Sequence, residues 1–229
     1  MTATNALQFP IGEAPAMGQP MEVADGVYWL RMPLPFSLNH INLWLLEDND
    51  GWTIVDTGIN TLATKDLWQQ VFDSHLKNKP VNQLIVTHLH PDHVGLAGWL
   101  CEIWDLELQM SRTDYMACRV LMSDTGKPAP KAAINFYQRA GVSDEQLAVY
   151  KAKFGGYGKS IYPMPDSFIR LQDNETVVMA GQQWHIIVGR GHAPEHLCLM
   201  CPALNVFIAG DQLLPSISSN VSVWPTEPH

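Results

Sequence analysis

The chain has few cysteines, and they do not form a thiolate metal site. It contains four cysteines in 229 residues, and only Cys198 and Cys201 have the CxxC spacing seen in zinc and redox motifs. A four-thiolate zinc site needs a second such pair, so this class of site is excluded. The pair falls in an apolar segment that we expect to be a strand, and we interpret both residues as buried structural cysteines.

Basic residues and long hydrophobic runs are also scarce. The 14 Lys and Arg face 23 Asp and Glu, a formal net charge of −9. Nucleic-acid binders need a basic face, so this balance argues against a nucleic-acid partner. No apolar run approaches the roughly 20 residues of a membrane helix, and positions 1–21 lack the pattern of a secretory signal. We therefore expect a cytoplasmic protein with a small-molecule substrate and no membrane partner; the oligomeric state stays open, a homodimer included.

What the chain does have is enough apolar sequence for one globular domain. Apolar residues make up 46% and charged residues 16% of the chain, which is typical of a packed core. Prolines at 10, 15 and 20 predict an irregular lead-in over 1–21, so the domain would span 22–229.

Hydrophobic periodicity predicts strands on both sides of a helical region. Strands are expected at 27–32, 41–47, 52–56, 81–87, 106–110, 176–179, 183–188, 196–201 and 206–209. Helices are expected at 61–76, capped by Asn60, and at 91–104, 112–122, 131–140 and 143–154. Strand-rich halves around a helical insertion at about 111–165 predict an α/β fold, a sheet sandwich flanked by helices.

The most informative motif follows the strand expected at 81–87. It reads His88-Leu89-His90-Pro91-Asp92-His93. Residues two apart in extended chain face the same way, so His88 and His90 can aim at one ion. Pro91 keeps His90 extended and suits the first turn of a helix, which would place Asp92 and His93 near a second ion. Imidazole with carboxylate indicates zinc, iron or manganese rather than calcium or magnesium.

Three more strand ends carry candidate polar groups. A Gly-His pair places His192 after one strand, and a Gly-Asp pair places Asp211 after another. Asp56, in an Asp-Thr-Gly sequence, follows a third. Sites in sheet proteins gather beyond strand ends, so these groups are expected to meet.

In this order, the HxHxDH, GH and GD motifs with the Asp-Thr-Gly sequence resemble those of the metallo-β-lactamase-fold hydrolase superfamily, over about residues 26–214. The resemblance implies a four-layer αββα sandwich. It implies that His88, His90 and His192 bind a first metal and that Asp92 and His93 bind a second, with Asp211 bridging both. Asp56 and His196 match residues that orient the ligands or support them structurally.

The resemblance also implies an activity. We expect a hydrolase with two Zn²⁺ ions, or Fe or Mn, that uses metal-bound hydroxide on an ester-like bond, with a thioester or lactone first. Asp92 and Asp211 are the expected catalytic residues, and no residue is assigned to substrate binding. The alternatives are a phosphodiesterase or ribonuclease of the same fold, a mononuclear iron persulfide dioxygenase, and a metal-binding but catalytically impaired truncated protein.

The chain departs from the family pattern near its end. The pattern requires one more histidine several tens of residues beyond Asp211, to complete the second metal site. Here 18 residues follow Asp211, and His229 is the sole histidine among them. We therefore expect the C-terminal part of the fold to be missing and the second metal site to be incomplete.

Overall fold

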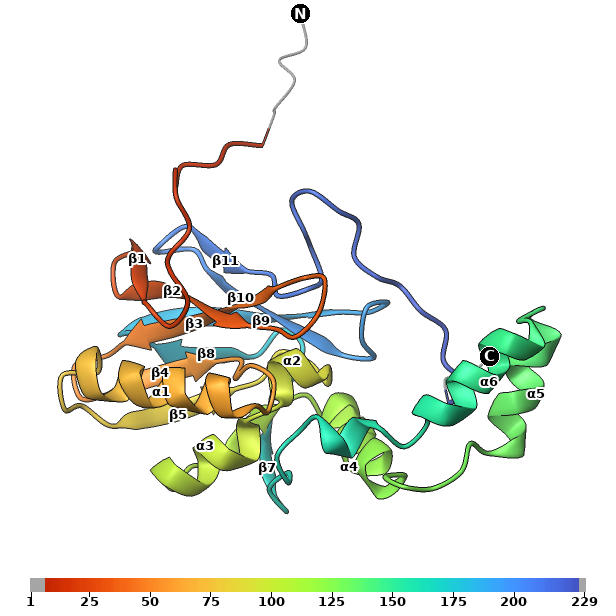
Figure 1. Ribbon diagram of the computed structural model, residues 1–229. Coiled ribbons are helices and arrows are strands. Elements are labelled where there is room, and N and C mark those ends of the chain that lie inside the picture. Colours follow the sequence, from red (N-terminus) through yellow and green to blue (C-terminus); the bar gives the residue numbers. More distant parts are fainter. Residues whose placement is uncertain (1–6, 227–229) are drawn as a thin grey trace, which may run out of the picture.

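The larger of two sheets determines how the other elements are arranged. The computed structural model describes residues 7–226 (Figure 1). Seven strands lie in sequential order: β1 Met21–Ala24, β2 Val27–Pro33, β3 His40–Glu47, β4 Trp52–Val55, β5 Val81–Ile85, β6 Leu108–Met110 and β7 Phe168–Arg170. Strands β1 to β4 are antiparallel, whereas β4 to β7 run parallel. The change occurs where short turns give way to helical crossovers, since parallel neighbours need a long connection.

The smaller sheet packs on the larger one. Its four antiparallel strands are β8 Thr176–Met179, β9 Gln182–Gly189, β10 His196–Cys201 and β11 Val206–Ile208, in the order β11-β10-β9-β8. Strand β10 turns Leu197, Leu199 and Cys201 toward the larger sheet. His196 and Cys198 therefore lie on its other face. All four cysteines are free and buried, as expected for structural cysteines.

Within residues 7–226, six α-helices and one short 3-10 helix connect the strands. They are α1 Leu62–Ser74, α2 Pro91–Val94, α3 Ala97–Trp104, α4 Arg112–Ser123, α5 Lys131–Arg139, α6 Asp144–Lys153 and the 3-10 helix Tyr157–Lys159. Helices α1 and α3 cover the free face of the larger sheet, while α5 and α6 stand away from the body of the molecule (Figure 1).

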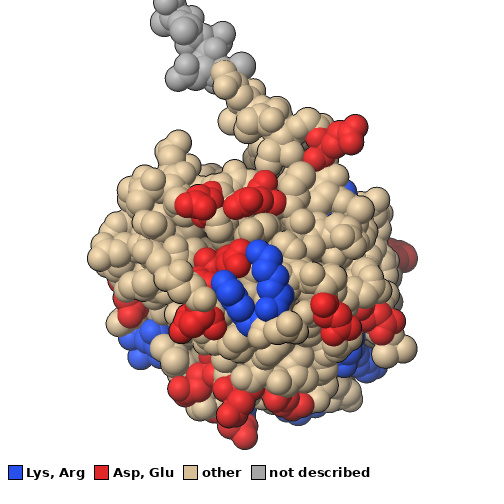
Figure 2. All heavy atoms as spheres, turned by 90° about the vertical axis from the view of Figure 1, so that its left-hand side faces the viewer, with Lys and Arg blue, Asp and Glu red and all other residues tan. Residues whose placement is uncertain are grey.

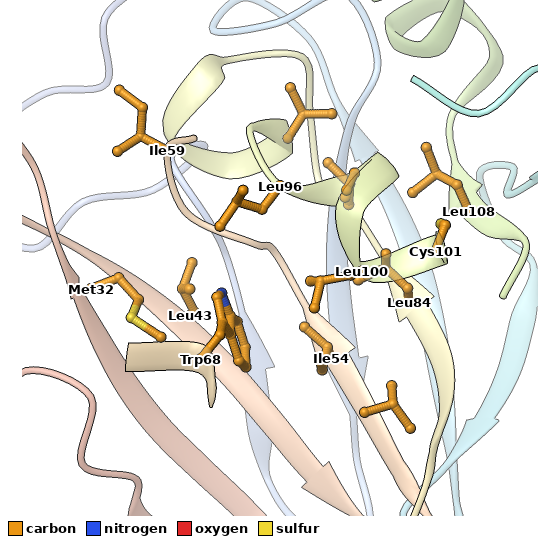
Figure 3. Close-up of a cluster of buried hydrophobic side chains, with 14 of the residues drawn as sticks. Met32, Leu43, Ile54, Ile59, Trp68, Leu84, Leu96, Leu100, Cys101 and Leu108 are labelled. Carbon is orange, nitrogen blue, oxygen red and sulfur yellow. The ribbon is translucent and has the colours of Figure 1, made fainter. Parts of the chain in front are cut away.

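Two hydrophobic cores hold these layers together. In the first, Trp68 of α1 and Leu100 of α3 point onto the sheet, against Met32, Leu43, Ile54 and Leu84 (Figure 3). The second lies between the sheets, where Leu46 and Ile85 meet Trp184 and Leu199, all fully buried. Fully burying each such side chain contributes roughly 1.5–3 kcal/mol. The second core fixes the smaller sheet, and with it the loop after β9, relative to β5.

The predicted α/β sheet sandwich is confirmed, with one layer to qualify. The outer face of the smaller sheet leaves apolar side chains 40–57% exposed, namely Val178, Ile187, Met200 and Phe207. No helix within residues 7–226 covers that face (Figure 1). The described residues therefore form three of the four expected layers.

The expected helix over 91–104 is two helices in the structure. The Thr57 hydroxyl donates to the His93 carbonyl (2.7 Å) and accepts the Leu96 N–H (3.0 Å), in place of a helical bond. At Gly95 a Cβ atom would lie 2.5 Å from the Gly58 carbonyl oxygen. The close approach of this turn breaks the helix between α2 and α3.

Other local predictions need smaller corrections. Thr61, not Asn60, caps α1, since its side chain accepts the Thr64 N–H. Strands β1 and β7 were not predicted, because both are short edge strands with little alternation. Part of the lead-in is packed: Arg31 accepts the Gly18 N–H at its carbonyl and donates to the Pro15 carbonyl.

Acidic side chains are spread over the face at the left of Figure 1, with basic ones gathered near its centre (Figure 2). Lys77 and Lys79 pair with Glu47, at 3.5 and 3.1 Å. None of the helices described has both the length and the hydrophobicity to cross a bilayer.

Candidate metal centre

Seven polar side chains meet where the ends of four strands converge. They come from the turns after β4, β5, β9 and β11 and from helix α2, and they are Asp56, His88, His90, Asp92, His93, His192 and Asp211. The parallel pairing of β4 with β5 sets Asp56 beside the strand end that leads to His88. The inter-sheet core brings the other two turns to the same edge.

His88, His90 and His192 form the three-histidine cluster. His90 Nδ1 lies 2.9 Å from both His88 Nε2 and His192 Nε2, and those two nitrogens are 3.2 Å apart. Zn–N bonds of about 2.0–2.1 Å place the ligand nitrogens of a tetrahedral site about 3.3 Å apart. The cluster is therefore close to the spacing that such a metal requires.

The outer nitrogens of two of these rings are tied to oxygen atoms. The Thr87 hydroxyl donates to the Asp56 carboxylate (2.8 Å), so it accepts from His88 Nδ1–H (2.9 Å). His192 Nδ1 can only donate to its partner, the Asn220 carbonyl oxygen (2.9 Å). The tautomer that these bonds select carries its proton on Nδ1 in both rings, and in it the two Nε2 atoms present lone pairs to each other.

This arrangement fits a metal and does not fit a hydrogen-bonded cluster. A proton on His90 Nδ1 could serve one neighbouring nitrogen but not both. Facing lone pairs in a buried site are unfavourable unless a cation lies between them. The donor set, with the Asp211 carboxylate beside it, places four ligand atoms within 4.8 Å of one another.

The protonation of the cluster agrees with metal binding. Burial and the neighbouring histidines hold the pKa of His88 well below its usual value. The same causes lower the pKa of His90 to about 4. Both rings are neutral at pH 7, which is the form that binds metals.

Asp92, His93 and Asp211 form the carboxylate cluster beside it. Asp211 points one oxygen to each side: Oδ2 lies 3.4 Å from His192 Nε2, and Oδ1 lies 3.5 Å from His93 Nε2. Asp92 Oδ2 is 3.9 Å from the same His93 nitrogen. Asp211 therefore faces His192 of the three-histidine cluster with one oxygen and His93 with the other.

His93 is buried, and one of its nitrogens is left without a hydrogen bond. Its Nδ1 donates to Asp56 Oδ2 (2.7 Å), whereas no described atom satisfies Nε2. Burial lowers its pKa, but Asp56 and Asp211 outweigh this and hold it well above the usual value in the metal-free protein. Burial likewise opposes ionisation of Asp211, but His93 prevails and lowers its pKa to about 2. A cation, proton or metal, belongs at this point.

Asp56 and His196 hold candidate ligand residues in place by hydrogen bonds. Asp56 adopts a left-handed conformation, with φ of 65°, and accepts from the Thr87 N–H (2.7 Å) as well as from His93. His196 Nε2 accepts the Asp211 N–H (3.1 Å), so its lone pair is already used, and its ring stacks on His88 at 4.5 Å. Gly210 packs against that ring, where a Cβ atom would lie 2.5 Å away.

The structure also brings in residues that the sequence interpretation missed. Thr87 and Asn220 bind the outer nitrogens of His88 and His192. Asp114 and Tyr157 bind the N–H and the carbonyl of Leu89, which stands between His88 and His90. Only Thr87 adjoins the motif, so it alone carried a sequence signal. His229, the candidate for a further ligand, lies outside the described residues.

Comparison with known proteins gives consistent matches. The sequence pattern of the metallo-beta-lactamase superfamily matches residues 37–229. The chain is 25% identical over 202 residues to the probable metallo-hydrolase YqjP of Bacillus subtilis, covering 86% of this chain and 60% of that protein. It is 22% identical over 200 residues to the bovine (Bos taurus) acyl-coenzyme A thioesterase MBLAC2, covering 82% of this chain and 64% of the relative.

A solved structure of a beta-lactamase domain protein from Burkholderia ambifaria matches with a TM-score of 0.82 and 41% identity. The match covers 93% of this chain and 61% of the Burkholderia ambifaria chain. The chain therefore spans between 60% and 64% of the length of these three relatives.

Proposed function

The chain belongs to the metallo-beta-lactamase superfamily, and we propose that it is a metal-dependent hydrolase of an ester-like bond, with a thioester or lactone as substrate. The observation that carries the proposal is the convergence of three imidazole nitrogens within 3.2 Å of one another. Two of them have lone pairs that only a cation can satisfy together.

In this proposal the two clusters hold two metal ions. His88, His90 and His192 hold the first, Asp92 and His93 contribute to the second, and Asp211 lies between them. Imidazole and carboxylate ligands favour Zn²⁺, with Fe or Mn as alternatives. When bound, such ions lower the pKa of water and polarise the carbonyl oxygen under attack.

The protein residues orient the reaction. Asp92 is 22% exposed at its side chain, so its carboxylate can accept a hydrogen bond from water and turn the oxygen toward the substrate. Asp211 supplies negative charge between the clusters, where its lowered pKa of about 2 keeps the carboxylate ionised. Asp56 keeps His93 Nδ1 protonated and thereby directs Nε2 into the site.

A thioester is the first substrate to test. It is supported by the name of the bovine relative, an acyl-coenzyme A thioesterase, although that protein shares 22% identity with this chain. A lactone is a cyclic ester, so its hydrolysis involves the same attack on a carbonyl carbon and would use the same residues. Phosphodiesters, the persulfide dioxygenase reaction and an inactive metal-binding protein are the alternatives to be separated.

The test combines metal analysis with a substrate panel. Purified protein is assayed for Zn, Fe and Mn and then offered acyl-coenzyme A thioesters, lactones, a β-lactam, bis-p-nitrophenyl phosphate and glutathione persulfide. We expect bound metal and turnover of a thioester or lactone, both lost in His88→Ala. Turnover of the phosphodiester alone, or oxygen consumption with the persulfide, would overturn the substrate proposal. Unchanged turnover in His88→Ala would refute the site.

A further inference from the structure

Asp114 is a buried carboxylate in the first turn of α4, outside the two clusters. Its side chain has no exposed surface, and burial raises its pKa to about 6. Among residues 7–226 no lysine or arginine forms an ion pair with it. A buried carboxylate without a cationic partner is costly, and an apolar side chain would avoid that cost. Its hydrogen bonds indicate what it does.

The two oxygens of Asp114 bind two segments that are far apart in the sequence. Oδ1 accepts the Leu89 N–H at 3.0 Å. Oδ2 accepts the Glu195 N–H at 2.7 Å and lies 3.3 Å from the Ser111 hydroxyl. Leu89 stands between His88 and His90, and Glu195 stands between His192 and His196. One carboxylate therefore joins both loops that carry the three-histidine cluster.

The carbonyl group of Leu89 is also held. The Tyr157 hydroxyl donates to the Leu89 carbonyl oxygen at 2.5 Å and lies 3.0 Å from Cys118 Sγ. Both polar groups that frame this residue, its N–H and its carbonyl, are thus bound by side chains of the 111–165 region. The N–H lies in the peptide that joins Leu89 to His88, and the carbonyl lies in the peptide that joins Leu89 to His90. A rotation of either peptide therefore changes where the neighbouring histidine ring points.

A second contact ties the same two elements in the opposite direction. Glu195 Oε2 accepts the Thr113 N–H at the start of α4, at 3.0 Å. The first turn of α4 and the loop that follows His192 therefore exchange hydrogen bonds. This reciprocity limits sliding between them, as in a capping arrangement.

We propose that Asp114 and Tyr157 are positioning residues for the metal centre: together they hold the backbone of Leu89 on both sides, and Asp114 fixes it at the distance from the His192 loop that the three histidines need. The inference rests on the proposed metal binding. It assigns to the helical region 111–165 a role in setting the coordination geometry.

The experiment measures Co²⁺ binding and the visible absorption spectrum of the bound ion, which reports coordination geometry without any substrate. Asp114→Asn replaces one acceptor oxygen by an NH₂ group that faces a backbone N–H. We expect its Co²⁺ affinity to fall about 10–100-fold, the range for partners behind metal ligands, with a changed spectrum. Tyr157→Phe removes one hydroxyl and keeps the ring; we expect a fall of about 2–10-fold with a smaller spectral change.

Two control variants make the same chemical changes elsewhere. Asp166→Asn alters a carboxylate that is 99% exposed and paired with Arg119. Tyr162→Phe removes a hydroxyl that donates to Glu102 at 2.7 Å. Both should bind Co²⁺ with the affinity and spectrum of the unaltered protein.

The outcomes separate the two proposals. If the unaltered protein binds no Co²⁺, the proposed metal site itself fails. If it binds, and Asp114→Asn and Tyr157→Phe keep its affinity and spectrum, the positioning role is wrong. Should Asp114→Asn not fold, Tyr157→Phe decides the question alone. A changed spectrum supports the positioning of Leu89 by these side chains, and an unchanged spectrum overturns it.

Discussion

The three-histidine cluster and the carboxylate cluster lie side by side, but the chain holds them in different ways. The three ligand nitrogens of the first are within 3.2 Å of one another, and two of the outer nitrogens are tied to Thr87 and Asn220. The second has gaps of 3.5 and 3.9 Å around His93 Nε2. Only one end of that histidine is hydrogen-bonded.

The difference shows two routes to a metal site. Hydrogen bonds behind the rings organise the three-histidine cluster before any ion binds, so little reorganisation remains. Charge attraction organises the carboxylate cluster, which in the metal-free protein a proton on His93 can hold together. We therefore expect the first cluster to bind metal more tightly than the second.

The largest loss of metal binding is expected from His90→Ala. His90 Nδ1 contacts both other ligand nitrogens, so its loss should weaken metal binding by more than about 100-fold, beyond the range for outer partners. Chelator competition measures the affinity. His185→Ala is the control, since that histidine is exposed on β9 and contacts Thr176. An equal loss in both variants would contradict the assignment.

The next test removes a hydrogen bond behind the ligands. Thr87→Val keeps the shape of a fully buried side chain but deletes the hydroxyl that links Asp56 with His88. We expect metal affinity to fall about 10–100-fold. Thr87→Ser retains the hydroxyl and should stay within a few-fold of the unaltered protein. Equal affinity in the Val and Ser variants would show that the first cluster needs no such support.

A smaller effect, on the stability of the fold, is expected from a substitution at Gly210, the residue before Asp211. In Gly210→Ala the new Cβ atom would lie 2.5 Å from the His196 ring, at a backbone φ of +51°. Overpacking and the left-handed backbone should lower the free energy of unfolding by about 1–3 kcal/mol. Urea unfolding measures it, and Gly181→Ala is the control, with a φ of +64° but no atom within 4 Å of its Cβ position. Equal losses would assign the cost to the backbone alone.

The pH dependence of the metal-free protein separates the clusters by sign. Burial lowers the pKa of His88 well below the usual value and those of His90 and His196 to about 4. The unfolded chain then binds more protons below about pH 6.5, so stability falls as the pH drops from 6.5 toward 4. Asp114 opposes this loss of stability. Its pKa is raised to about 6, so the folded protein holds a proton there that the unfolded chain has already released.

His93 acts in the opposite direction. Its raised pKa gives stability that is complete below about pH 6.5 and is lost as the pH rises through the folded value. Stability should therefore peak near pH 6–7, with an acid limb of about 1.4 kcal/mol per pH unit for each net proton. Denaturant titrations across pH measure both limbs. In His93→Gln the alkaline limb should flatten while the acid limb stays; an unchanged alkaline limb would contradict the assignment.

Much of the fold could be predicted from local pattern. The strand β3, the helix that begins after Ser143 and the short, β-branched or apolar strands of the smaller sheet follow from period and turn chemistry. The break at Gly95 could not be predicted, because the Thr57 hydroxyl that causes it comes from a turn 39 residues away. The edge strands β1 and β7 escaped for a related reason: pairing, rather than composition, makes them strands.

The amino-acid sequence alone determined the types of ligand and their places after strand ends. Alternation along extended chain and the helix-starting proline after His90 are local effects, so they can be recognised without the fold. The tertiary structure alone decided which nitrogen faces inward in His88, His93 and His192, because Thr87, Asp56 and Asn220 respectively select their tautomers. It also placed Asp114 between two loops whose ligands His90 and His192 are 102 residues apart. Such contacts depend on how two sheets pack, and no local pattern encodes that distance.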